Sequence, residues 1–330
     1  MAAAEVAGEF DTIRTLLGPL AHPEYALGLM DDAAVLPSRP GHDLVLTKDA
    51  IVEGVHFLPG DPLDTVAQKL LRVNLSDLAA KGAEPFGYLL ACHWSARCGW
   101  TEREAFVAGL ARDQEAFGIH VLGGDTVRTP GPASFSATML GWVPKGGTIL
   151  RSGARPGHAV YVTGNIGDGR LGLQAAQGHL TLEPERIATL AEQYRRPTPR
   201  LAFGQAVRGL AGAGIDISDG LVADLGHVAA ASRVGIALQL ESLPLSVAAR
   251  AWFDRRTDPL AALQDLATGG DDYEVVFTVH PLDEAAVRRE AEGLHLRLTR
   301  IGEVTVGAGV SVTYLGQPVE IAKCGWTHDR

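Results

Sequence analysis

Nine aspartates stand in six short motifs, most of them beside glycine or serine. The motifs are Met30-Asp31-Asp32-Ala33-Ala34, Thr47-Lys48-Asp49, Asn74-Leu75-Ser76-Asp77, Gly123-Gly124-Asp125-Thr126, Asp216-Ile217-Ser218-Asp219-Gly220 and Gly269-Gly270-Asp271-Asp272. Carboxylates brought together repel one another unless a cation lies between them. Mg²⁺ prefers oxygen ligands and is usually shared with substrate phosphates. One aspartate beside a glycine is typical of a turn, but six such motifs together indicate phosphoryl chemistry assisted by several metal ions.

The elements that must position these motifs alternate between strands and helices. Strands are expected at 43–48, 86–93, 133–143, 158–163, 235–240, 273–279 and 298–306, and helices at 62–81, 101–117, 168–177, 179–195, 200–211, 220–233 and 282–293. Both halves mix the two element types, so the fold class is α/β or α+β. The stretch 144–157 is rich in glycine and proline, and it predicts a boundary between domains at 1–145 and 146–330.

The helix expected at 62–81 carries polar residues where its buried stripe should run. Val66, Leu70 and Val73 recur at helical spacing, and Asn74 and Asp77 fall on or beside that stripe. An unpaired buried carboxylate costs several kcal/mol, so Asp77 needs either a cation or hydrogen-bond donors. A metal contact is favoured because the chain is crowded with carboxylates, and a structural hydrogen bond within the helix is the alternative.

Composition excludes several function classes. The chain has 330 residues, 46% of them hydrophobic and 21% charged, with a net charge of -10. An acidic protein of this kind is not expected to bind nucleic acid or an anionic membrane through a basic patch. No apolar run approaches the ~20 residues needed to cross a bilayer. Met1–Glu5 lacks the features of a secretory signal.

The three cysteines, Cys92, Cys98 and Cys324, match no zinc or redox spacing. They are expected to be free thiols in a reducing compartment, and the protein is therefore expected to be cytoplasmic.

A glycine-rich segment raises a second possibility. Residues 167–172 (Gly-Asp-Gly-Arg-Leu-Gly) match G-x-G-x-x-G after an expected strand, which is the pattern of a dinucleotide-binding turn. The match is weak in a chain with 39 glycines, and no acidic residue ends a second strand at the right distance. A simple strand-to-helix turn is the favoured interpretation. The chain also has no Gly-Lys dipeptide for a Walker A loop and no His-Arg-Asp tripeptide of protein kinases.

Taken in order, the motifs resemble those of the thiamine-monophosphate kinase family. The resemblance runs from about Gly8 to Trp326 and rests on the following segments: Asp-Asp-Ala-Ala-Val (31–35), Thr-Lys-Asp (47–49), Val-Glu-Gly-Val-His-Phe (52–57), Asn-Leu-Ser-Asp-Leu-Ala-Ala (74–80), Gly-Gly-Asp-Thr (123–126), Asp-Ile-Ser-Asp-Gly-Leu (216–221) and Gly-Gly-Asp-Asp-Tyr-Glu (269–274). The first and fourth segments also fit the wider superfamily of aminoimidazole ribonucleotide synthetase, selenophosphate synthetase and the hydrogenase maturation protein. The His-Phe pair and the last segment distinguish the thiamine branch.

The resemblance implies a two-domain aminoimidazole ribonucleotide synthetase-like fold that dimerises through its N-terminal domain, with ATP and metal ions in the cleft between domains. It implies ATP-dependent phosphorylation of thiamine monophosphate to thiamine diphosphate by direct transfer, without a general base. The implied Mg²⁺ ligands are Asp32, Thr47, Lys48, Asp49, Asp77, Asp125, Asp216 and Asp219. The implied ATP contacts are Gly124, Asp125, Arg151 and Ser218, and the implied substrate contacts are His56, Asp271 and Trp326.

Physical chemistry agrees with these roles. A phosphate acceptor is already ionised near neutral pH, so catalysis must come from positioning and from neutralising charge. Arg151 offers a planar fork for phosphate, although a surface salt bridge is the alternative. Trp326 offers an aromatic face to the cationic thiazolium or the pyrimidine, with packing as its alternative. His56 can donate to a phosphate, or it can be a structural histidine.

Three positions depart from the family pattern. Lys48 replaces a threonine, Asp271 replaces a glutamate and Met30 replaces a glycine. If position 48 binds metal through its backbone carbonyl, nothing is lost, whereas an inward ammonium could displace an ion. Asp271 is one methylene shorter than glutamate, so its substrate contact is expected to be longer or bridged by water. Two alternative functions stay open: a superfamily synthetase acting on a ribonucleotide or on selenide, and a non-catalytic nucleotide-binding maturation factor.

Overall fold

The computed structural model describes residues 8–326, and the chain divides into two compact units. Unit 1 comprises Met1–Leu78 and Glu84–Gly146, and unit 2 comprises Ala79–Ala83 and Gly147–Arg330. The N-terminal residues 1–5, whose composition argued against a secretory signal, lie outside the described part. The main division falls after Gly146, within the glycine- and proline-rich stretch of the sequence, and the last two residues of helix α2 (Leu63–Ala80) belong to unit 2.

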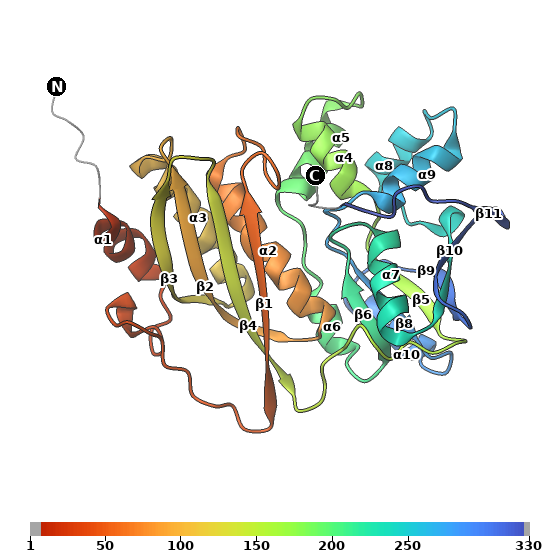
Figure 1. Ribbon diagram of the computed structural model, residues 1–330, viewed down its shortest axis with the longest axis horizontal. Coiled ribbons are helices and arrows are strands. Elements are labelled where there is room, and N and C mark those ends of the chain that lie inside the picture. The colour runs from red at the N-terminus through yellow and green to blue at the C-terminus, as the bar shows by residue number, and fades with distance from the viewer. Residues whose placement is uncertain (1–7, 327–330) are drawn as a thin grey trace. The chain divides into compact units, whose positions relative to one another are not determined.

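Unit 1 is built on a four-stranded sheet with two long helices (Figure 1). The strands are β1 (His42–Val52), β2 (Glu84–Ser95), β3 (His120–Thr129) and β4 (Ser134–Pro144), in the order β1-β4-β2-β3. Only β2 and β3 pair in parallel. The helices are α2 (Leu63–Ala80) and α3 (Trp100–Phe117). Short helical turns precede the sheet at α1 (Glu9–Asp11), η1 (Thr12–Leu17), η2 (Gly18–Leu20) and η3 (Leu27–Leu29).

The two faces of the unit 1 sheet differ in burial. Alternate residues of β2, including Tyr88 and Trp94, are fully buried on the face that α2 and α3 cover (Figure 1). The residues between them point to the opposite face, where Leu89 of β2 and Leu46 of β1 are 42% and 58% exposed. The period of two along a strand thus separates a packed face from an open one, and the open face carries large apolar side chains.

Unit 2 contains a seven-stranded sheet in the order β11-β10-β7-β9-β5-β8-β6. Its strands are β5 (Ala159–Thr163), β6 (Ala211–Asp216), β7 (Gly235–Gln239), β8 (Val275–Val279), β9 (Leu298–Thr305), β10 (Gly309–Tyr314) and β11 (Gln317–Val319). All neighbours pair antiparallel except β7 and β10. The helical elements are α4 (Asp168–Ala176), α5 (Pro184–Arg195), α6 (Leu201–Ala206), α7 (Leu221–Ser232), η4 (Leu240–Ser242), α8 (Val247–Phe253), α9 (Pro259–Thr268) and α10 (Glu284–Gly293).

The sheet of unit 2 separates two hydrophobic clusters. The larger contains aliphatic side chains such as Val160 and Ile215 together with Leu225 of α7. The smaller contains the aromatic residues Tyr161 and Phe277. Because both faces are covered, β5 and β8 are buried at every position, which is why their sequences are continuous apolar runs rather than alternating ones.

The mixed α/β architecture predicted from the sequence is confirmed, with several local differences. Strand β3 was not expected because Gly123-Gly124-Asp125 resembles a turn, and β6 lies partly within the helix expected at 200–211, which ends at Ala206. Strand β6 is Ala-Gly-Ala-Gly-Ile-Asp, so it lacks the β-branched residues that mark most strands. Helices α8 and α9 and strands β10 and β11 were also not expected. Within residues 8–326, no helix has the length and apolar character needed to cross a membrane.

Candidate active site

Three of the predicted metal ligands lie close together where β1 meets α2 in unit 1. Thr47 on β1 donates its hydroxyl hydrogen to Oδ2 of Asp77 on α2. Two residues further along β1, the backbone N–H of Asp49 donates to Oδ1 of Asn74 at 3.0 Å, and Nδ2 of Asn74 donates to the Leu70 carbonyl at 2.8 Å. Asp77 therefore has a hydroxyl donor, and the buried Asn74 ties the helix to the strand. The group of hydroxyl and carboxylate oxygens is a donor set that suits Mg²⁺.

The neighbouring predicted residues lie on the other face of the same sheet. Strand register pairs Lys48 with Thr138, and Asp125 with Ala91, on the face opposite to Thr47 and Asp49. Lys48 is exposed there, so its ammonium does not enter the Thr47–Asp77 cluster. Within unit 1 the structure therefore brings together Thr47, Asp49 and Asp77, but not Lys48 or Asp125.

Gly124 shows why the Gly-Gly-Asp motif needs glycine. Its φ is +152°, and a Cβ built there would lie 1.8 Å from the Leu90 carbonyl oxygen of the adjacent strand. No side chain fits such a close approach of two backbones. Gly124 thereby allows β3 to pair closely with β2 immediately before Asp125.

His56 is oriented by its own turn. Its Nδ1 accepts a hydrogen bond from the Val52 backbone N–H at 3.1 Å, so in the neutral ring Nε2 carries the proton. The buried Lys69 donates to the His56 carbonyl at 3.0 Å and fixes the backbone of the turn. The side chain is thus presented as a donor through Nε2. The predicted Asp32 lies in an exposed bend before β1, and Met30 beside it is also exposed.

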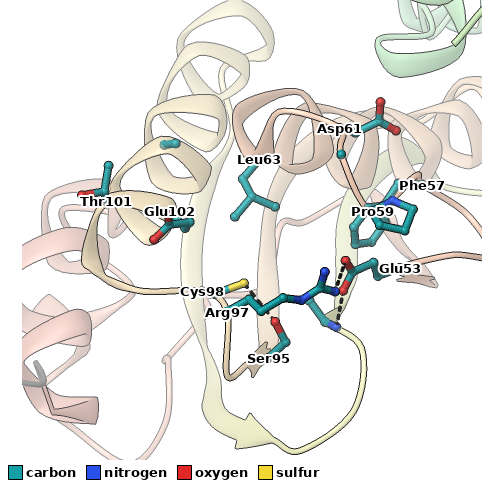
Figure 2. A pocket seen from close by; sticks show the side chains of 13 residues that line it. Glu53, Phe57, Pro59, Asp61, Leu63, Ser95, Arg97, Cys98, Thr101 and Glu102 are labelled. Atoms are coloured by element: carbon teal, nitrogen blue, oxygen red, sulfur yellow. Dashed lines mark hydrogen bonds and ion pairs between the residues drawn. The ribbon is translucent and has the colours of Figure 1, made fainter.

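A pocket of about 390 Å³ opens in unit 1 just beyond the carboxyl ends of β1 and β2 (Figure 2). Apolar side chains such as Phe57 and Leu63 line it together with the thiol of Cys98. Glu53 on its wall is held by Arg97 at 2.5 Å and by the Ala133 backbone N–H at 3.0 Å. This pocket could not be anticipated from the sequence, because its lining comes from the starts of two helices and from three loops.

In unit 2, an irregular loop between β6 and α7 carries three predicted residues. Asp216 ends β6 and is buried, and Ser218 and Asp219 follow it. One oxygen of Asp224, in the first turn of α7, accepts the backbone N–H groups of Ser218, Asp219 and Gly220 at 3.1, 3.2 and 3.2 Å. Burial, together with the neighbouring Asp219 carboxylate, raises the pKa of Asp224 to about 7 against the lowering effect of these backbone donors. The buried Asp224 carboxylate therefore fixes the backbone conformation of the loop between β6 and α7.

The same loop contacts both predicted substrate residues of unit 2. The Ser218 carbonyl accepts the Asp271 backbone N–H at 2.9 Å, and the Asp219 carbonyl accepts the Trp326 backbone N–H at 2.9 Å. The Tyr273 hydroxyl donates to Oδ1 of Asp271 at 3.1 Å. The structure thus brings Asp271 and Trp326, which lie much later in the sequence, to the loop that carries Asp216, Ser218 and Asp219.

Trp326 lies at a large groove between α7 and the chain after β11. Asp219, His227, Cys324 and Trp326 line this groove, whose volume is about 1530 Å³. The indole is 53% exposed, and the Lys323 ammonium lies 5.4 Å from the centre of its ring. A half-exposed aromatic ring that already attracts a cation is suited to a cationic heterocycle.

Possible metal ligands also gather beside this groove. One ligand atom each from Asp219, Asp224 and His227 lies within 4.8 Å of the others. Because three amides already occupy one oxygen of Asp224, Asp219 is the more available carboxylate of this group. Arg151 of unit 2 is exposed, and its carbonyl accepts the Ser232 hydroxyl at 3.1 Å.

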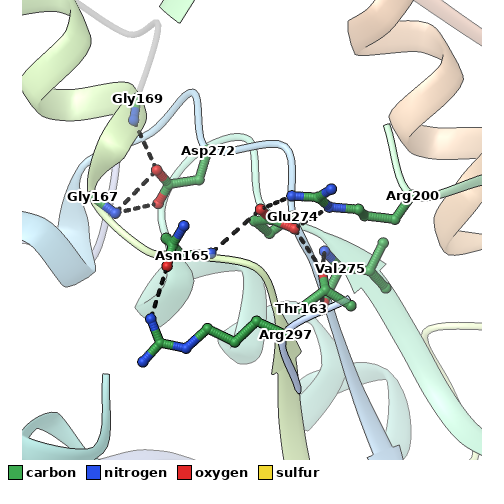
Figure 3. Close-up of polar contacts among 9 residues, drawn as sticks. All are labelled: Thr163, Asn165, Gly167, Gly169, Arg200, Asp272, Glu274, Val275 and Arg297. Carbon is green, nitrogen blue, oxygen red and sulfur yellow. Dashed lines mark hydrogen bonds and ion pairs between the residues drawn. The ribbon is translucent and has the colours of Figure 1, made fainter. Parts of the chain in front are cut away.

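The glycine-rich turn of residues 167–172 is occupied by a carboxylate of the chain itself (Figure 3). Asp272 accepts the Gly167 N–H at 3.0 and 2.9 Å and the Gly169 N–H at 2.9 Å. These are the amides that would hold a pyrophosphate in a dinucleotide fold. The favoured interpretation as a strand-to-helix turn is therefore consistent with the structure. Sequence reasoning assigned no role to Asp272, which stands inside a quoted motif, or to Asp224, which follows the 216–221 segment after two residues.

Two domain families match these two units. The model for the N-terminal domain of AIR synthase related proteins matches residues 30–143, and that for the C-terminal domain matches residues 155–315. Two structures called hydrogenase maturation protein HypE share this fold at 18–20% identity with TM-scores of 0.75. The fold thus defines a protein of the AIR synthase related class.

More similar relatives identify the branch. The chain is 50% identical over 321 residues to thiamine-monophosphate kinase of Caulobacter vibrioides, covering 97% of this chain and 90% of that protein. It is 38% identical to the Escherichia coli thiamine-monophosphate kinase, covering 98% and 96%. The structure of the Stenotrophomonas maltophilia enzyme has a TM-score of 0.82 at 37% identity, covering 97% and 99%. The structure of AaThiL complexed with AMPPCP and TMP has a TM-score of 0.77 at 31% identity, covering 99% of both chains. The chain belongs to the thiamine-monophosphate kinase family.

Proposed function

We propose that the chain transfers the terminal phosphoryl group of ATP to the phosphate of thiamine monophosphate, giving thiamine diphosphate and ADP. The observation that carries the proposal is similarity over essentially the whole length to proteins named for this reaction, one of them complexed with AMPPCP and TMP. The donor sets of both units agree with it, because they offer the hard oxygen ligands that metal-assisted phosphoryl transfer requires.

The two units contribute different groups to the reaction. In unit 1, Thr47, Asp49 and Asp77 would hold Mg²⁺ together. Asp125, Asp32 and the Lys48 carbonyl are further proposed ligands that lie outside this cluster. In unit 2, Asp216 and Asp219 would hold Mg²⁺. Bound Mg²⁺ would neutralise charge on the transferred phosphoryl group. The exposed position of Lys48 supports a role for its backbone rather than its side chain.

The remaining residues bind and orient the two substrates. Gly124, Asp125, Arg151 and Ser218 would contact ATP, with Arg151 supplying a guanidinium fork. His56, through Nε2, and Asp271 would contact thiamine monophosphate. Trp326 would present its exposed ring to the cationic thiazolium or the pyrimidine. The acceptor oxygen is ionised near neutral pH, so none of these residues needs to remove a proton.

We further propose a homodimer formed through the open face of the unit 1 sheet. Leu44 and Leu46 of β1, Leu89 of β2 and Val127 of β3 are each at least 40% exposed, and strand register puts them on one face. Contiguous apolar side chains on a monomer surface are typical of an interface. An isologous pairing of two such sheets would cover them.

A cytoplasmic location is part of the proposal. Cys92, Cys98 and Cys324 are all free thiols, and a reducing compartment would keep the accessible ones reduced.

Chromatography of thiamine species tests the proposed reaction. The full-length protein is incubated with ATP, Mg²⁺ and thiamine monophosphate, with a parallel sample containing a chelator. We expect thiamine diphosphate to appear in step with ADP and to be abolished by chelation. ATP binding without any thiamine diphosphate would refute the kinase proposal and favour a superfamily synthetase or a maturation factor.

A further inference from the structure

Two residues of the Gly-Gly-Asp-Asp-Tyr-Glu segment hold an unfavourable backbone conformation. Asp271 has φ +69° and Tyr273 has φ +50°, both in the left-handed region that residues with a Cβ rarely enter. Strain of this kind persists only where the surroundings impose it, and it concentrates at functional sites. Asp271 is also the residue proposed to contact the substrate. The groups that impose its conformation are therefore of functional interest.

The residue between the two strained positions is anchored on both of its oxygens. Asp272 is 2% exposed, and its carboxylate accepts the amides of Gly167 and Gly169 at the start of α4 (Figure 3). A carboxylate at a helix N-terminus that receives several backbone donors is strongly oriented. Asp272 is thus fixed in place by hydrogen bonds to the glycine-rich turn, rather than by bonds to the groove at Trp326 or to Ser218.

Glu274 provides a second anchor on the far side of Tyr273. It is 3% exposed and receives the Arg200 guanidinium in a two-point contact, with Nε at 2.6 Å. The Thr163 hydroxyl donates to the same carboxylate at 2.7 Å (Figure 3). Buried, hydrogen-bonded carboxylates at 272 and 274 therefore flank Tyr273, and the first of them also follows Asp271 directly.

The glycine-rich turn completes the arrangement. A Cβ built on Gly169 would lie 2.3 Å from the carbonyl carbon of Asp271, so only glycine permits the backbone of Asp271 to lie against the turn. The G-x-G-x-x-G segment of residues 167–172 thus has a structural role and does not need to bind a dinucleotide. It receives the Asp272 carboxylate through its amides, and it leaves room for the neighbouring strained residue.

We propose that Asp272, bound by the amides of Gly167 and Gly169, is a positioning residue that holds Asp271 in its left-handed conformation and so sets the contact with thiamine monophosphate. The Glu274–Arg200 pair is the second support of the same segment. This inference rests on the proposed function, in which Asp271 contacts that substrate. Asp272 itself touches neither substrate nor metal, and it acts only through Asp271.

The test is a double-mutant cycle on the full-length protein with Asp272→Asn and Asp271→Asn. Asparagine at 272 keeps the shape but turns an NH₂ group toward an amide donor, whereas asparagine at 271 removes only the charge and still tolerates positive φ. We expect Asp272→Asn to raise KM for thiamine monophosphate at least about tenfold, the scale of a misplaced substrate contact. KM for ATP should change by less than about twofold, because Asp224 holds Ser218 separately.

Non-additivity is the decisive readout of the cycle. If Asp272 acts through Asp271, the double variant is no worse than Asp271→Asn alone in kcat/KM for thiamine monophosphate. Effects that multiply would overturn the proposal, as would a lowered Tm in Asp272→Asn with kcat/KM unchanged. Asp258→Asn is the matched control, since that carboxylate accepts the Ala261 amide at the start of α9 and has no bond to this segment.

Hydrogen exchange tests the anchoring role of Asp272 without depending on the proposed kinase activity. Hydrogen exchange of the amides of Gly167, Gly169, Asp271 and Tyr273 should accelerate in Asp272→Asn and not in Asp258→Asn. If the wild-type protein makes no thiamine diphosphate, the kinase proposal fails while exchange still tests the anchor. If Asp272→Asn does not fold, Gly169→Ala takes its place in the cycle. Its added Cβ should produce the same selective, non-additive loss, and wild-type kinetics in that variant would refute the proposal.

Discussion

Thr47 in β1 donates a hydrogen bond to the carboxylate of Asp77 in α2, thirty residues later in the chain. The contact joins the Thr-Lys-Asp motif to the Asn-Leu-Ser-Asp motif at the face where α2 packs on the sheet. Lys48, between Thr47 and Asp49, points to the other face because successive side chains of a strand alternate. The departure from the family pattern at position 48 therefore leaves this cluster of oxygen donors intact.

The Thr47–Asp77 bond gives a first prediction. Thr47→Val removes the hydroxyl but keeps the branched shape, and Thr47→Ser keeps the hydroxyl. Loss of a hydrogen bond to a charged group costs roughly 1.5–3 kcal/mol, so we expect Thr47→Val to raise the Mg²⁺ concentration for half-maximal turnover by about tenfold or more. Thr47→Ser should stay close to wild type. Equal Mg²⁺ dependence in all three proteins would contradict a metal-binding role.

The carboxylates of unit 1 give a second prediction. Asp77→Asn and Asp125→Asn should each lower kcat by at least about 10²-fold, the scale of lost electrostatic stabilisation. Asp43→Asn is the control, because this exposed β1 carboxylate accepts the Gly146 amide and belongs to no proposed ligand set. Near-normal turnover in both of the first two variants would rule out the assignment of these metal ligands.

Cysteine reactivity locates the thiamine rings. Cys324 lines the groove with Trp326, and Cys98 lines the pocket of unit 1. Cys92 is fully buried, and burial raises its pKa, so it should resist alkylation. We expect thiamine monophosphate to slow alkylation of Cys324 at least about threefold while leaving Cys98 unchanged, because thiolates react only when accessible. Mass spectrometry of labelled peptides measures the alkylation rate of each cysteine. Protection of Cys98 alone would indicate that the thiamine rings bind in the pocket of unit 1 instead.

The open sheet face predicts how the protein self-associates. Leu46→Glu combined with Leu89→Glu should convert the proposed dimer to a monomer, since two buried like charges cannot be accommodated at a symmetric interface. Val306→Glu tests the same substitution at a site that is 89% exposed in unit 2. Light scattering should show a dimer for wild type and for Val306→Glu. A stable wild-type monomer, or a dimer that survives the double substitution, would count against this interface.

Asp168 at the start of α4 predicts a pH-dependent difference in stability. Burial raises the pKa of Asp168 to about 6, with the Glu274 charge adding to the rise against the Ser246 hydroxyl bond. Since the folded pKa lies above the unfolded one, the stability it contributes is present at low pH and is lost as pH rises through about 6. Asparagine does not titrate, so Asp168→Asn should gain up to about 3 kcal/mol relative to wild type between pH 4 and 7.

Thermal unfolding of both proteins across that pH range checks this expectation. The Tm of Asp168→Asn minus that of wild type should increase from pH 4 to pH 7. A difference that is constant or that changes in the opposite direction would show that Asp168 ionises without cost in the folded protein.

The sequence by itself determined the chemistry and the class of fold. Oxygen-rich motifs in a chain without a Walker A lysine already indicated phosphoryl transfer assisted by metal ions, and their order indicated the family. The helices α2, α3, α4 and α7 were also predictable, because helical periodicity is a local property that adjacent residues display. Strands β3 and β6 were not. The Gly-Gly-Asp run inside β3 resembles a turn, and the glycines and alanines of β6 carry no strand signal, so pairing with neighbouring strands is what stabilises both.

Only the tertiary structure decided which residues meet. Strand register separates Lys48 from Thr47, and long-range contacts bring Asp271 and Trp326 to the same loop as Ser218 and Asp219. The purpose of Asp224 and Asp272 was likewise invisible in the sequence, since each acts on backbone amides that only the folded chain presents to it. The motifs in the sequence indicate which side chains take part in the chemistry. How these side chains are arranged in space follows from contacts between segments that are distant in the chain.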